Sequence, residues 1–392
     1  MQAYYKIIQS IENFSADRGR EKKPLSECLR HVLQEDVVAD MNMPPFDKSA
    51  MDGFACRMED IDQELEILET IQAGKLPGKA IGPKQCSRIM TGAAVPQGAD
   101  CVFMMEDAVF SGDKSVTCNN PATKRNICYT GEDYKQGDVL INKGGVICPA
   151  HIGTLASAGY AQVAVSKMPG VGILATGTEL VEPSEWPAGG QIRNSNSYQV
   201  MAQLWSMGIR SDYHGIIVDD IEAISKSFEK ALKSNDVVII TGGASQGDFD
   251  FVPAILQRHG FEIVLEKTGI QPGNPMSFSR KKQQFCFGLS GNPVSSFVQF
   301  ELFVKPFLYK IMGANWEAAQ VKGRLAQSFK RNKGHRFGIV PVRINSDSSV
   351  AEIGFHGSAH INSLAHANAL MEVPVGVTYL KEGEEVNVRL IQ

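Results

Sequence analysis

The chain has 392 residues, of which 43% are hydrophobic and 21% are charged, and 39 basic against 43 acidic side chains give a net charge of −4. This length predicts several domains of ~100–200 residues each, and the hydrophobic content is sufficient for ordinary buried cores. The slightly acidic balance provides no electrostatic basis for binding nucleic acid or an anionic membrane.

The cysteines are scattered along the chain, and none has the Cys-x-x-Cys spacing that is typical of zinc or redox sites. Scattered thiols in a chain of this length are typical of a reducing compartment. The first residues lack the apolar run of a secretory signal, and no apolar run approaches the ~18 residues that cross a membrane. We therefore expect a cytoplasmic protein without a membrane segment.

The N-terminal segment has apolar residues at helical spacing, which predicts an amphipathic helix. We expect a charged turn over residues 18–23 and a weaker helix over residues 24–32. The apolar positions of the first helix are Tyr4, Ile7, Ile8, Ile11 and Phe14.

From Met43 onward, turn residues and short alternating runs replace the helical pattern. Runs over residues 65–71, 87–90 and 101–105 are typical of short strands, and they predict a compact β domain over residues 43–135. Residues 136–168 then predict a strand, a short helix near 150–158 and a second strand. We expect this segment to pack with residues 1–42 as one discontinuous domain, which makes the β domain an insertion.

Strands and helices alternate over residues 169–313, which predicts parallel βαβ units in a doubly wound sheet. The fold class is therefore multidomain α/β plus β, because residues 314–392 return to short strands. In the α/β part, strands are expected at residues 171–175, 212–217, 237–240, 262–265 and 285–289, and helices at 197–207, 221–233, 252–258 and 293–312. In the C-terminal part, strands are expected at residues 321–325, 337–344, 350–355, 369–373 and 385–391.

The loop Thr241–Asp250 is a candidate ligand site. It reads Thr-Gly-Gly-Ala-Ser-Gln-Gly-Asp-Phe-Asp and follows an apolar run that predicts a buried strand. Glycines allow a backbone to approach a phosphate closely, and free amides at the start of the next helix can point at it. A plain strand-to-helix turn with solvated acids is the alternative.

Further polar turns follow neighbouring strands, at residues 175–180, 219–220 and 289–296. Because the carboxyl ends of parallel strands meet at one edge of a sheet, we expect these turns to form one ligand cleft. The sequence contains no Gly-x-Gly-x-x-Gly fingerprint and no Walker lysine, which excludes a Rossmann or P-loop interpretation.

Acidic residues follow three of these predicted strands, namely Glu179, Asp219 and Asp250. If they converge, their oxygens form a hard site suited to Mg²⁺. The alternative is a role at helix N-termini, which acids commonly fill. Asp220 is better placed as such a cap, and Asp219 is better placed as a site residue.

Two segments are highly specific, Ser-Ala-Met-Asp-Gly at residues 49–53 and Arg-Ile-Met-Thr-Gly at residues 88–92. They occur in one order with further segments at residues 131–133, 176–180, 242–245 and 291–295. Together these segments resemble the MoeA and gephyrin E-domain family of molybdopterin molybdenumtransferases, and the resemblance covers essentially the whole chain.

The resemblance implies an elongated homodimer in which the third domain is similar to molybdopterin-adenylating proteins and the last domain is a small β-barrel. It places the active cleft between the third domain of one subunit and the inserted β domain of the other. It implies molybdenum cofactor biosynthesis, in which molybdate and adenylylated molybdopterin are the substrates, Mg²⁺ assists and AMP is released. It also implies a transient contact with a molybdopterin-adenylating protein.

Site residues are carried over from the family position by position. Glu179, Asp219 and Asp250 match acids that hold Mg²⁺ and the pyrophosphate, and Lys267 matches a lysine that contacts the anionic ligand. Polar positions of the inserted domain are matched by Asp52, Thr91 and Asp133. Positions that receive molybdate are matched by Pro275, Ser295, Arg336 and Ser363, and the glycine turns add Gly242, Gly243, Ser245, Gly291 and Asn292 as cofactor-binding positions.

The chain departs from the family where positive charges are expected. The family has Lys-Pro-Gly-Lys-Pro where this chain has Gln-Pro-Gly-Asn-Pro at residues 271–275. Ser290 replaces a proline, and residues 127–130 replace an arginine-rich run. Since a charged hydrogen bond contributes ~1.5–3 kcal/mol, each missing lysine weakens anion binding by roughly 10–150-fold unless another cation compensates. Arg193 and Lys333 are candidates for that compensation.

Three hypotheses follow from the sequence. The first is an active molybdenumtransferase with a re-tuned oxyanion site. The second is a paralogue for another oxyanion or a modified pterin, and the third is a non-catalytic pterin-binding or scaffold protein. The retained acids favour the first hypothesis, since a scaffold has no need of a Mg²⁺ site, whereas the missing lysines favour the other two.

Overall fold

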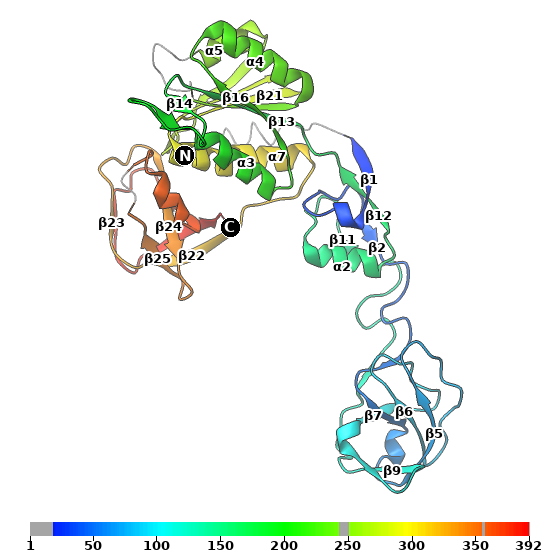
Figure 1. Cartoon of the computed structure of the whole chain (residues 1–392). Helices are drawn as coiled ribbons and strands as arrows, with labels where there is room; N and C mark the ends of the chain where they lie inside the picture. The colour runs from blue at the N-terminus through cyan, green and yellow to red at the C-terminus, as the bar shows by residue number, and fades with distance from the viewer. Residues whose placement is uncertain (1–18, 243–250, 355–356, 392) are drawn as a thin grey trace. The chain divides into compact units, whose positions relative to one another are not determined.

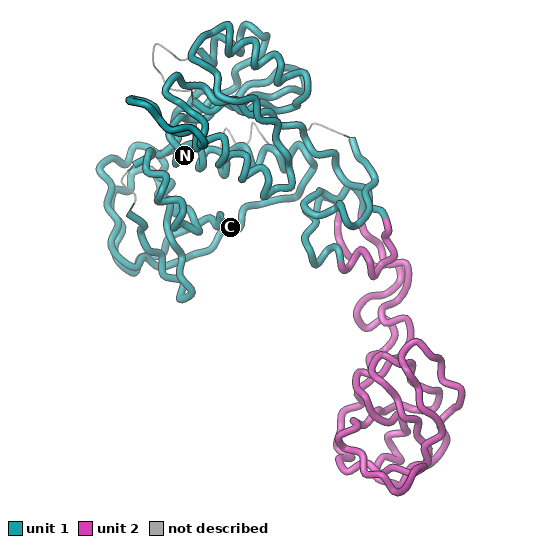
Figure 2. Tube along the Cα trace, viewed as in Figure 1, with its two compact units in different colours: residues 1–35, 143–152, 162–392 teal, residues 36–142, 153–161 magenta. Residues whose placement is uncertain are grey.

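The computed structural model describes residues 19–242, 251–354 and 357–391. The chain divides into two compact units, which are described separately here (Figure 2). One unit comprises residues 1–35, 143–152 and 162–392, and the other comprises residues 36–142 and 153–161. Among the described helices, none is both long and apolar enough to cross a membrane.

The smaller unit is built around a mixed β-sheet with strand order β7-β4-β6-β5-β9-β8. Phe54 and Phe103 lie opposite each other on β4 and β7, and their rings stack at 5.3 Å in the core. The strands are β4 (Gly53–Cys56), β5 (Leu65–Ile71), β6 (Gln85–Ile89), β7 (Cys101–Met104), β8 (Ala108–Phe110) and β9 (Ser115–Cys118). Short 3₁₀ turns are η2 (Met58–Asp60) and η3 (Met105–Asp107). The short-strand pattern predicted from Met43 onward is thus confirmed.

Two-stranded pairs complete this unit. They are β3 (Lys48–Ser49) with β10 (Ile127–Cys128), and β2 (Val37–Val38) with β11 (Val139–Ile141). Both pairs are antiparallel and join segments far apart in the sequence.

The N-terminal expectations are partly wrong. A charged turn was expected over residues 18–23, but residues 20–24 form β1 (Arg20–Pro24), which pairs antiparallel with β12 (Gln162–Ser166). The weak helix expected over residues 24–32 reduces to the 3₁₀ turn η1 (Leu25–Glu27). Cross-strand pairing with a segment about 140 residues away determines this conformation, and local propensity does not report such pairing. The helix expected near 150–158 is present as α2 (Pro149–Ser157), whereas the helix expected over residues 4–14 lies outside the described residues.

The larger unit contains an α/β sheet with strand order β16-β13-β17-β21-β20-β18. β13, β16, β17 and β21 run parallel, so their carboxyl ends meet at one edge. The strands are β13 (Val171–Thr176), β16 (Ser211–Ile217), β17 (Val237–Thr241), β18 (Glu262–Lys267), β20 (Pro275–Lys281) and β21 (Gln284–Leu289). A small parallel pair, β14 (Leu180–Val181) with β15 (Ile192–Arg193), lies beside this edge.

Helices cover both faces of this sheet (Figure 1). α4 and α5 pack on one face around Phe228, and α3 and α6 with α7 pack on the other around Phe287 and Phe307. The doubly wound interpretation is therefore confirmed. The helices are α3 (Asn196–Ser206), α4 (Ile221–Ser234), α5 (Val252–Arg258), α6 (Pro293–Gln299) and α7 (Lys305–Ile311).

Two details of the α/β prediction are wrong. β20 was not predicted, and it runs antiparallel to both of its neighbours, β21 and β18, so the sheet is mixed rather than wholly parallel at this edge. The helix expected over residues 293–312 is interrupted by a π-helical segment, η4 (Phe300–Val304), between α6 and α7. Apolar periodicity alone does not distinguish an α-helix from one with a π-turn, because both bury the same face.

The C-terminal strands close into a small barrel, in the order β24-β25-β22-β28-β26, because β26 also pairs with β24. β19 (Ile270–Gln271), from the α/β part, adds to β24 in parallel and joins the barrel to that part of the unit. The strands are β22 (Gln320–Leu325), β24 (Phe337–Ile344), β25 (Ser349–Glu352), β26 (Ala369–Val373) and β28 (Glu385–Leu390), with the pair β23 (Phe329–Lys330) and β27 (Tyr379–Leu380) and the 3₁₀ turn η5 (Ile361–Ala365).

Gly53 should be essential to the smaller unit, because a Cβ atom there lies 1.9 Å from the Phe103 carbonyl oxygen. We expect Gly53→Ala to lower the free energy of unfolding by about 2 kcal/mol or more through overpacking. Gly153→Ala is the matched control, since a Cβ there meets nothing within 4 Å and the residue lies in α2. The control should stabilise by about 0.5–1 kcal/mol. Equal unfolding midpoints in denaturant for the two variants would contradict this prediction.

Candidate active site

A pocket of about 960 Å³ lies between the carboxyl edge of the α/β sheet and the barrel. The parallel register sets this edge, since Ala175 lies opposite Thr241 and Thr241 lies opposite Leu289. A volume of this size is within the usual range for small-molecule sites, ~300–1,000 Å³. Of the predicted site residues, the pocket brings together Glu179, Asp219, Gly242, Pro275, Gly291, Asn292, Ser295 and Arg336.

The acidic part of the pocket comes from the turns after β13 and β16. Asp219 Oδ2 accepts hydrogen bonds from the Thr178 backbone N–H at 3.0 Å and from the Thr178 hydroxyl at 3.3 Å. This contact joins the two turns, and among the described residues Asp219 Oδ1 has no hydrogen-bond partner. Asp220 instead caps α4, because its side chain accepts from the Ala223 N–H at 2.8 Å. The distinction between a site role for Asp219 and a cap role for Asp220 is thus consistent with the geometry.

Gly242 allows two turns to meet closely. Its φ is +92°, and a Cβ there lies 2.3 Å from the Thr176 carbonyl oxygen. Thr176 lines the pocket and is almost fully buried, and its hydroxyl has no hydrogen-bond partner among the described residues. Because a buried polar group without a partner is costly, this oxygen is suited to meet a polar ligand.

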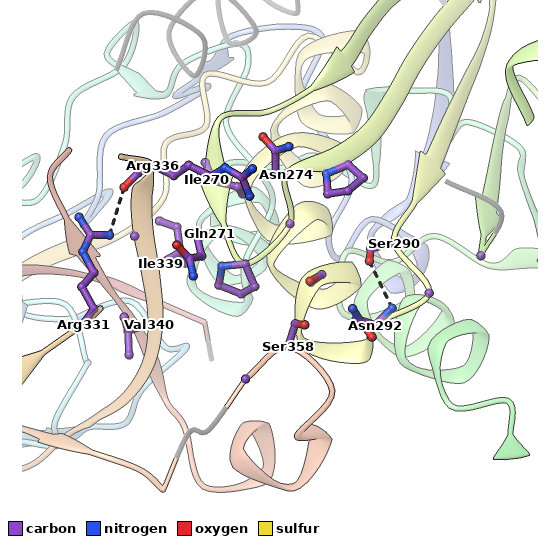
Figure 3. Close-up of a pocket in the computed structure, with 18 of the residues that line it drawn as sticks. Ile270, Gln271, Asn274, Ser290, Asn292, Arg331, Arg336, Ile339, Val340 and Ser358 are labelled. Atoms are coloured by element: carbon purple, nitrogen blue, oxygen red, sulfur yellow. Dashed lines mark hydrogen bonds between the residues drawn. The ribbon is translucent and has the colours of Figure 1, made fainter. Parts of the chain in front are cut away.

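The turn after β21 forms the next part of the wall. Asn196 on α3 donates to the Gly291 carbonyl at 2.8 Å. The Asn292 N–H donates to the Ser290 hydroxyl at 3.2 Å (Figure 3). Ser295, in the first turns of α6, is buried and lines the pocket. Hydroxyl and amide donors therefore gather at this end of the pocket.

The loop over residues 271–275, where the family lysines are missing, also lines the pocket. Asn274 Oδ1 accepts from the Gly269 N–H at 3.1 Å, which fixes this side chain across its own loop. The Asn274 amide nitrogen is then the donor that this side chain can offer to a ligand. At positions 271 and 274, this chain therefore has the neutral side chains of Gln and Asn in place of the long, flexible and charged lysines expected from the family.

Positive charge reaches the same pocket from the barrel, in Lys330, Arg331 and Arg336. Figure 3 shows Arg331 and Arg336 on the barrel side, with Gln271 and Asn274 between them and Ser290. Arg331 is anchored, because it donates to the carbonyls of Val377 at 2.7 Å, Pro374 at 2.7 Å and Arg336 at 3.1 Å. Burial lowers the pKa of Arg331, but an arginine remains charged near neutral pH.

Lys330 and Arg331 were not predicted as site residues. The available signal was the basic run Lys-Arg-Asn-Lys at residues 330–333, three residues before Arg336. The suggested compensators lie outside the described lining of the pocket. Arg193 instead donates to the Glu185 carbonyl at 3.1 Å and lies over the Trp186 ring at 5.4 Å.

Other predicted residues also lie outside the described lining. Lys267 is exposed at the end of β18, directly opposite Pro275 in the strand register. Ser363 lines a separate cavity of about 630 Å³, and its hydroxyl donates to the His360 carbonyl at 2.7 Å. Gly243, Ser245 and Asp250 lie outside the described residues.

In the smaller unit, Asp52 and Thr91 form an exposed pair. Asp52 Oδ1 accepts from the Thr91 hydroxyl at 2.6 Å and from the Thr91 N–H at 2.7 Å. These bonds hold the pKa of Asp52 below its usual value. Asp133 is exposed as well, and its backbone N–H donates to the Met43 carbonyl at 3.0 Å.

Glu179 and Asp219 are the acids that the described strand-end turns bring to the pocket. Among the described residues, no group of three His, Cys, Asp or Glu side chains could hold a metal ion. Mg²⁺, however, is commonly held by one or two carboxylates together with substrate phosphates and water. Glu179 and Asp219, which line the same pocket, are consistent with that mode of binding.

Comparison with known families agrees with this architecture. The MoeA N-terminal region (domain I and II) matches residues 2–159, the probable molybdopterin binding domain matches residues 172–310, and the MoeA C-terminal region (domain IV) matches residues 322–391. The α/β domain that carries the pocket is therefore of the molybdopterin-binding class.

Relatives of nearly the same length support the assignment. The molybdopterin molybdenumtransferase of Staphylococcus aureus (strain Mu50) is 36% identical over 396 residues, covering 98% of this chain and 94% of the relative. That of Bacillus subtilis (strain 168) is 37% identical, covering 98% and 93%. The solved molybdopterin biosynthesis moeA protein from Pyrococcus horikoshii OT3 is 31% identical, with a TM-score of 0.81 and 99% coverage of both chains. The chain belongs to the MoeA family of molybdopterin molybdenumtransferases, enzymes of molybdenum cofactor biosynthesis.

The Asp52–Thr91 pair can be tested by titration. Thr91→Ala removes the hydroxyl donor and keeps the N–H donor, so we expect the pKa of Asp52 to rise part of the way to its ordinary value of ~3.9. Folding lowers the pKa of Asp52, so the pair stabilises the folded protein fully at pH values above the ordinary pKa. This stabilisation is lost as the pH falls through the lowered, folded-state pKa. NMR titration of the Asp52 carboxyl measures both forms, and an unchanged pKa in the variant would refute the assignment.

Proposed function

We propose that this enzyme inserts molybdenum from molybdate into adenylylated molybdopterin and releases AMP in a Mg²⁺-assisted reaction. The observation that carries the proposal is one pocket that contains acids on strand-end turns and cationic side chains from the barrel. A pyrophosphate with a cation suits the first group, and an oxyanion suits the second. The hypothesis of an active enzyme is thereby favoured over that of a scaffold.

Glu179, Asp219 and Asp250 are the residues that we assign to Mg²⁺ and the pyrophosphate. Bound Mg²⁺ would neutralise negative charge on the phosphate oxygens as AMP departs. The hydrogen bonds from Thr178 orient the Asp219 carboxylate, because they occupy one oxygen and leave the other directed away from Thr178. The glycine turns at residues 242–245 and 291–292 would let the backbone approach the phosphates.

We assign molybdate to the region between the loop over residues 271–275 and the barrel. Molybdate is a dianion that accepts hydrogen bonds from guanidinium, hydroxyl and amide donors. Arg336, Ser295 and Asn274 offer these donors, and Pro275 shapes the wall. Lys330 and Arg331 would supply the positive charge that the lysines expected from the family at positions 271 and 274 would otherwise supply. Ser363 and Lys267 remain candidate contacts of the anionic ligand.

The remaining assignments concern assembly. We propose a homodimer in which Asp52, Thr91 and Asp133 of one subunit serve the cleft of the other. We further propose a cytoplasmic enzyme that receives its substrate through a transient contact with a molybdopterin-adenylating protein. The homodimer is testable by sedimentation.

AMP release from adenylylated molybdopterin is the decisive assay. We expect release to require both molybdate and Mg²⁺, because the carboxylates alone leave the phosphate charge uncompensated. Tungstate in place of molybdate tests the paralogue alternative, since neutral Gln271 and Asn274 could favour another oxyanion. Absence of release at millimolar molybdate would refute the proposed activity and favour the scaffold alternative.

Arg336 and Arg193 form a matched pair for the oxyanion site. Arg336→Ala should raise the molybdate concentration needed for half-maximal rate by roughly 10–150-fold, the equivalent of one charged hydrogen bond. Arg193→Ala should leave it unchanged, because the Arg193 guanidinium lies over Trp186. Equal effects of the two substitutions on the molybdate KM would contradict the placement.

A further inference from the structure

A buried amide connects two walls of the pocket. Gln299 is the last residue of α6, directly before the π-helical segment η4, and its side chain is fully buried. Its Oε1 accepts from the Ser290 N–H at 2.8 Å. Its Nε2 donates to the carbonyls of Gly273 at 2.9 Å and Pro275 at 2.6 Å.

These partners belong to loops that line the pocket on different elements. Ser290 lies in the turn between β21 and α6, whereas Gly273 lies in the loop between β19 and β20 and Pro275 is the first residue of β20. Both loops contribute to the described lining. The orientation of one amide group therefore sets the separation of the two loops.

The second loop is held together by hydrogen bonds to Thr268, so we expect its residues to shift together if Gln299 is displaced. The Thr268 hydroxyl donates to the Gly273 carbonyl at 2.7 Å, and the Thr268 N–H donates to the Asn274 carbonyl at 3.0 Å. Gly273 has φ +104°, and a Cβ there lies 3.1 Å from Gln299 Cγ. The loop thus packs directly on the Gln299 side chain.

Spacing matters here because the pocket offers short neutral donors at these positions. A lysine can adjust to an anion through its flexible four-carbon stem, whereas an asparagine or a serine has a short reach. Hydrogen bonds weaken beyond ~3.2 Å between N and O, so small changes in wall separation remove them. Asn274 and Ser290 therefore depend on how their loops are held.

We propose that Gln299 is a positioning residue that holds the 271–275 and 290–292 loops at the separation required to bind a tetrahedral oxyanion, which, under the proposed function on which this inference rests, is molybdate. Gln299 acts through the loops, and the loops contact the anion. Gln299 would thus act on binding of the anion and not on the bonds that form or break, so its substitution should change the KM for molybdate rather than kcat.

Two substitutions in the full-length protein separate the two halves of this contact. Gln299→Glu keeps the acceptor for the Ser290 N–H but places an oxygen against the Gly273 and Pro275 carbonyls. Gln299→Met removes both halves. We expect each variant to raise the molybdate KM, and the dissociation constant from calorimetric titration with molybdate, by about tenfold or more. The kcat and the KM for adenylylated molybdopterin should change less than about twofold.

Gln203→Met is the matched control. Gln203 on α3 is also buried. Its side chain donates to the Glu301 carboxylate in η4 at 2.8 Å and to the Phe297 carbonyl in α6 at 3.4 Å. The described hydrogen bonds of Gln203 therefore reach α6 and η4, and neither of the two loops. The control should lower the thermal unfolding temperature while leaving the molybdate KM unchanged. A similar rise in KM for the control would show that the effect is one of general stability and would overturn the proposal.

Hydrogen–deuterium exchange tests the positioning role independently of any reaction. The Ser290 amide should exchange faster in Gln299→Met and remain protected in Gln299→Glu, whereas the amides of Thr268 and Gly269 should exchange faster in both. If the wild-type protein neither binds molybdate nor releases AMP, the proposed function fails, and the exchange pattern alone decides the positioning role. Unchanged exchange, or an unchanged molybdate dissociation constant in a protein that binds molybdate, overturns the proposal.

Discussion

The parallel register of β13, β17 and β21 is the constraint on which the pocket depends. It places the ends of these strands, Thr176, Thr241 and Leu289, at one edge of the sheet, so the turns that follow must share the same space. Gly242 makes that crowding tolerable, because a side chain there would collide with the Thr176 backbone. The pocket is therefore a consequence of sheet topology before any ligand chemistry is considered.

Closure of the pocket depends on the barrel. β19 leaves the α/β part and pairs with β24, which brings the basic segment around Arg331 and Arg336 to face the sheet edge. The Arg331 guanidinium donates hydrogen bonds to backbone carbonyls, including that of Arg336, so it holds this segment in place and also supplies positive charge. Acids from the strand-end turns thus meet cations from the barrel in one cavity, to which the barrel also contributes Glu352.

The missing family lysines acquire a physical explanation in this arrangement. Where Gln271 and Asn274 stand, charge is absent locally, but the barrel supplies it across the pocket. Short neutral donors need a fixed backbone, and the buried Gln299 amide connects the loops that carry them. The pocket therefore contains both acidic and basic side chains, and of the basic ones Arg336 was indicated by the family pattern, whereas Lys330 and Arg331 were not.

The sequence by itself determined much of this protein, because apolar periodicity reports which face of an element is buried. It predicted the doubly wound sheet, the C-terminal strands, the cap at Asp220 and the site turns with Glu179, Asp219 and Gly242. Only the tertiary structure decided the pairing of β1 with β12, the antiparallel β20, and the approach of Lys330 and Arg331 to the pocket. These features depend on contacts between segments far apart in the chain, and neither local propensity nor residue spacing carries information about such contacts.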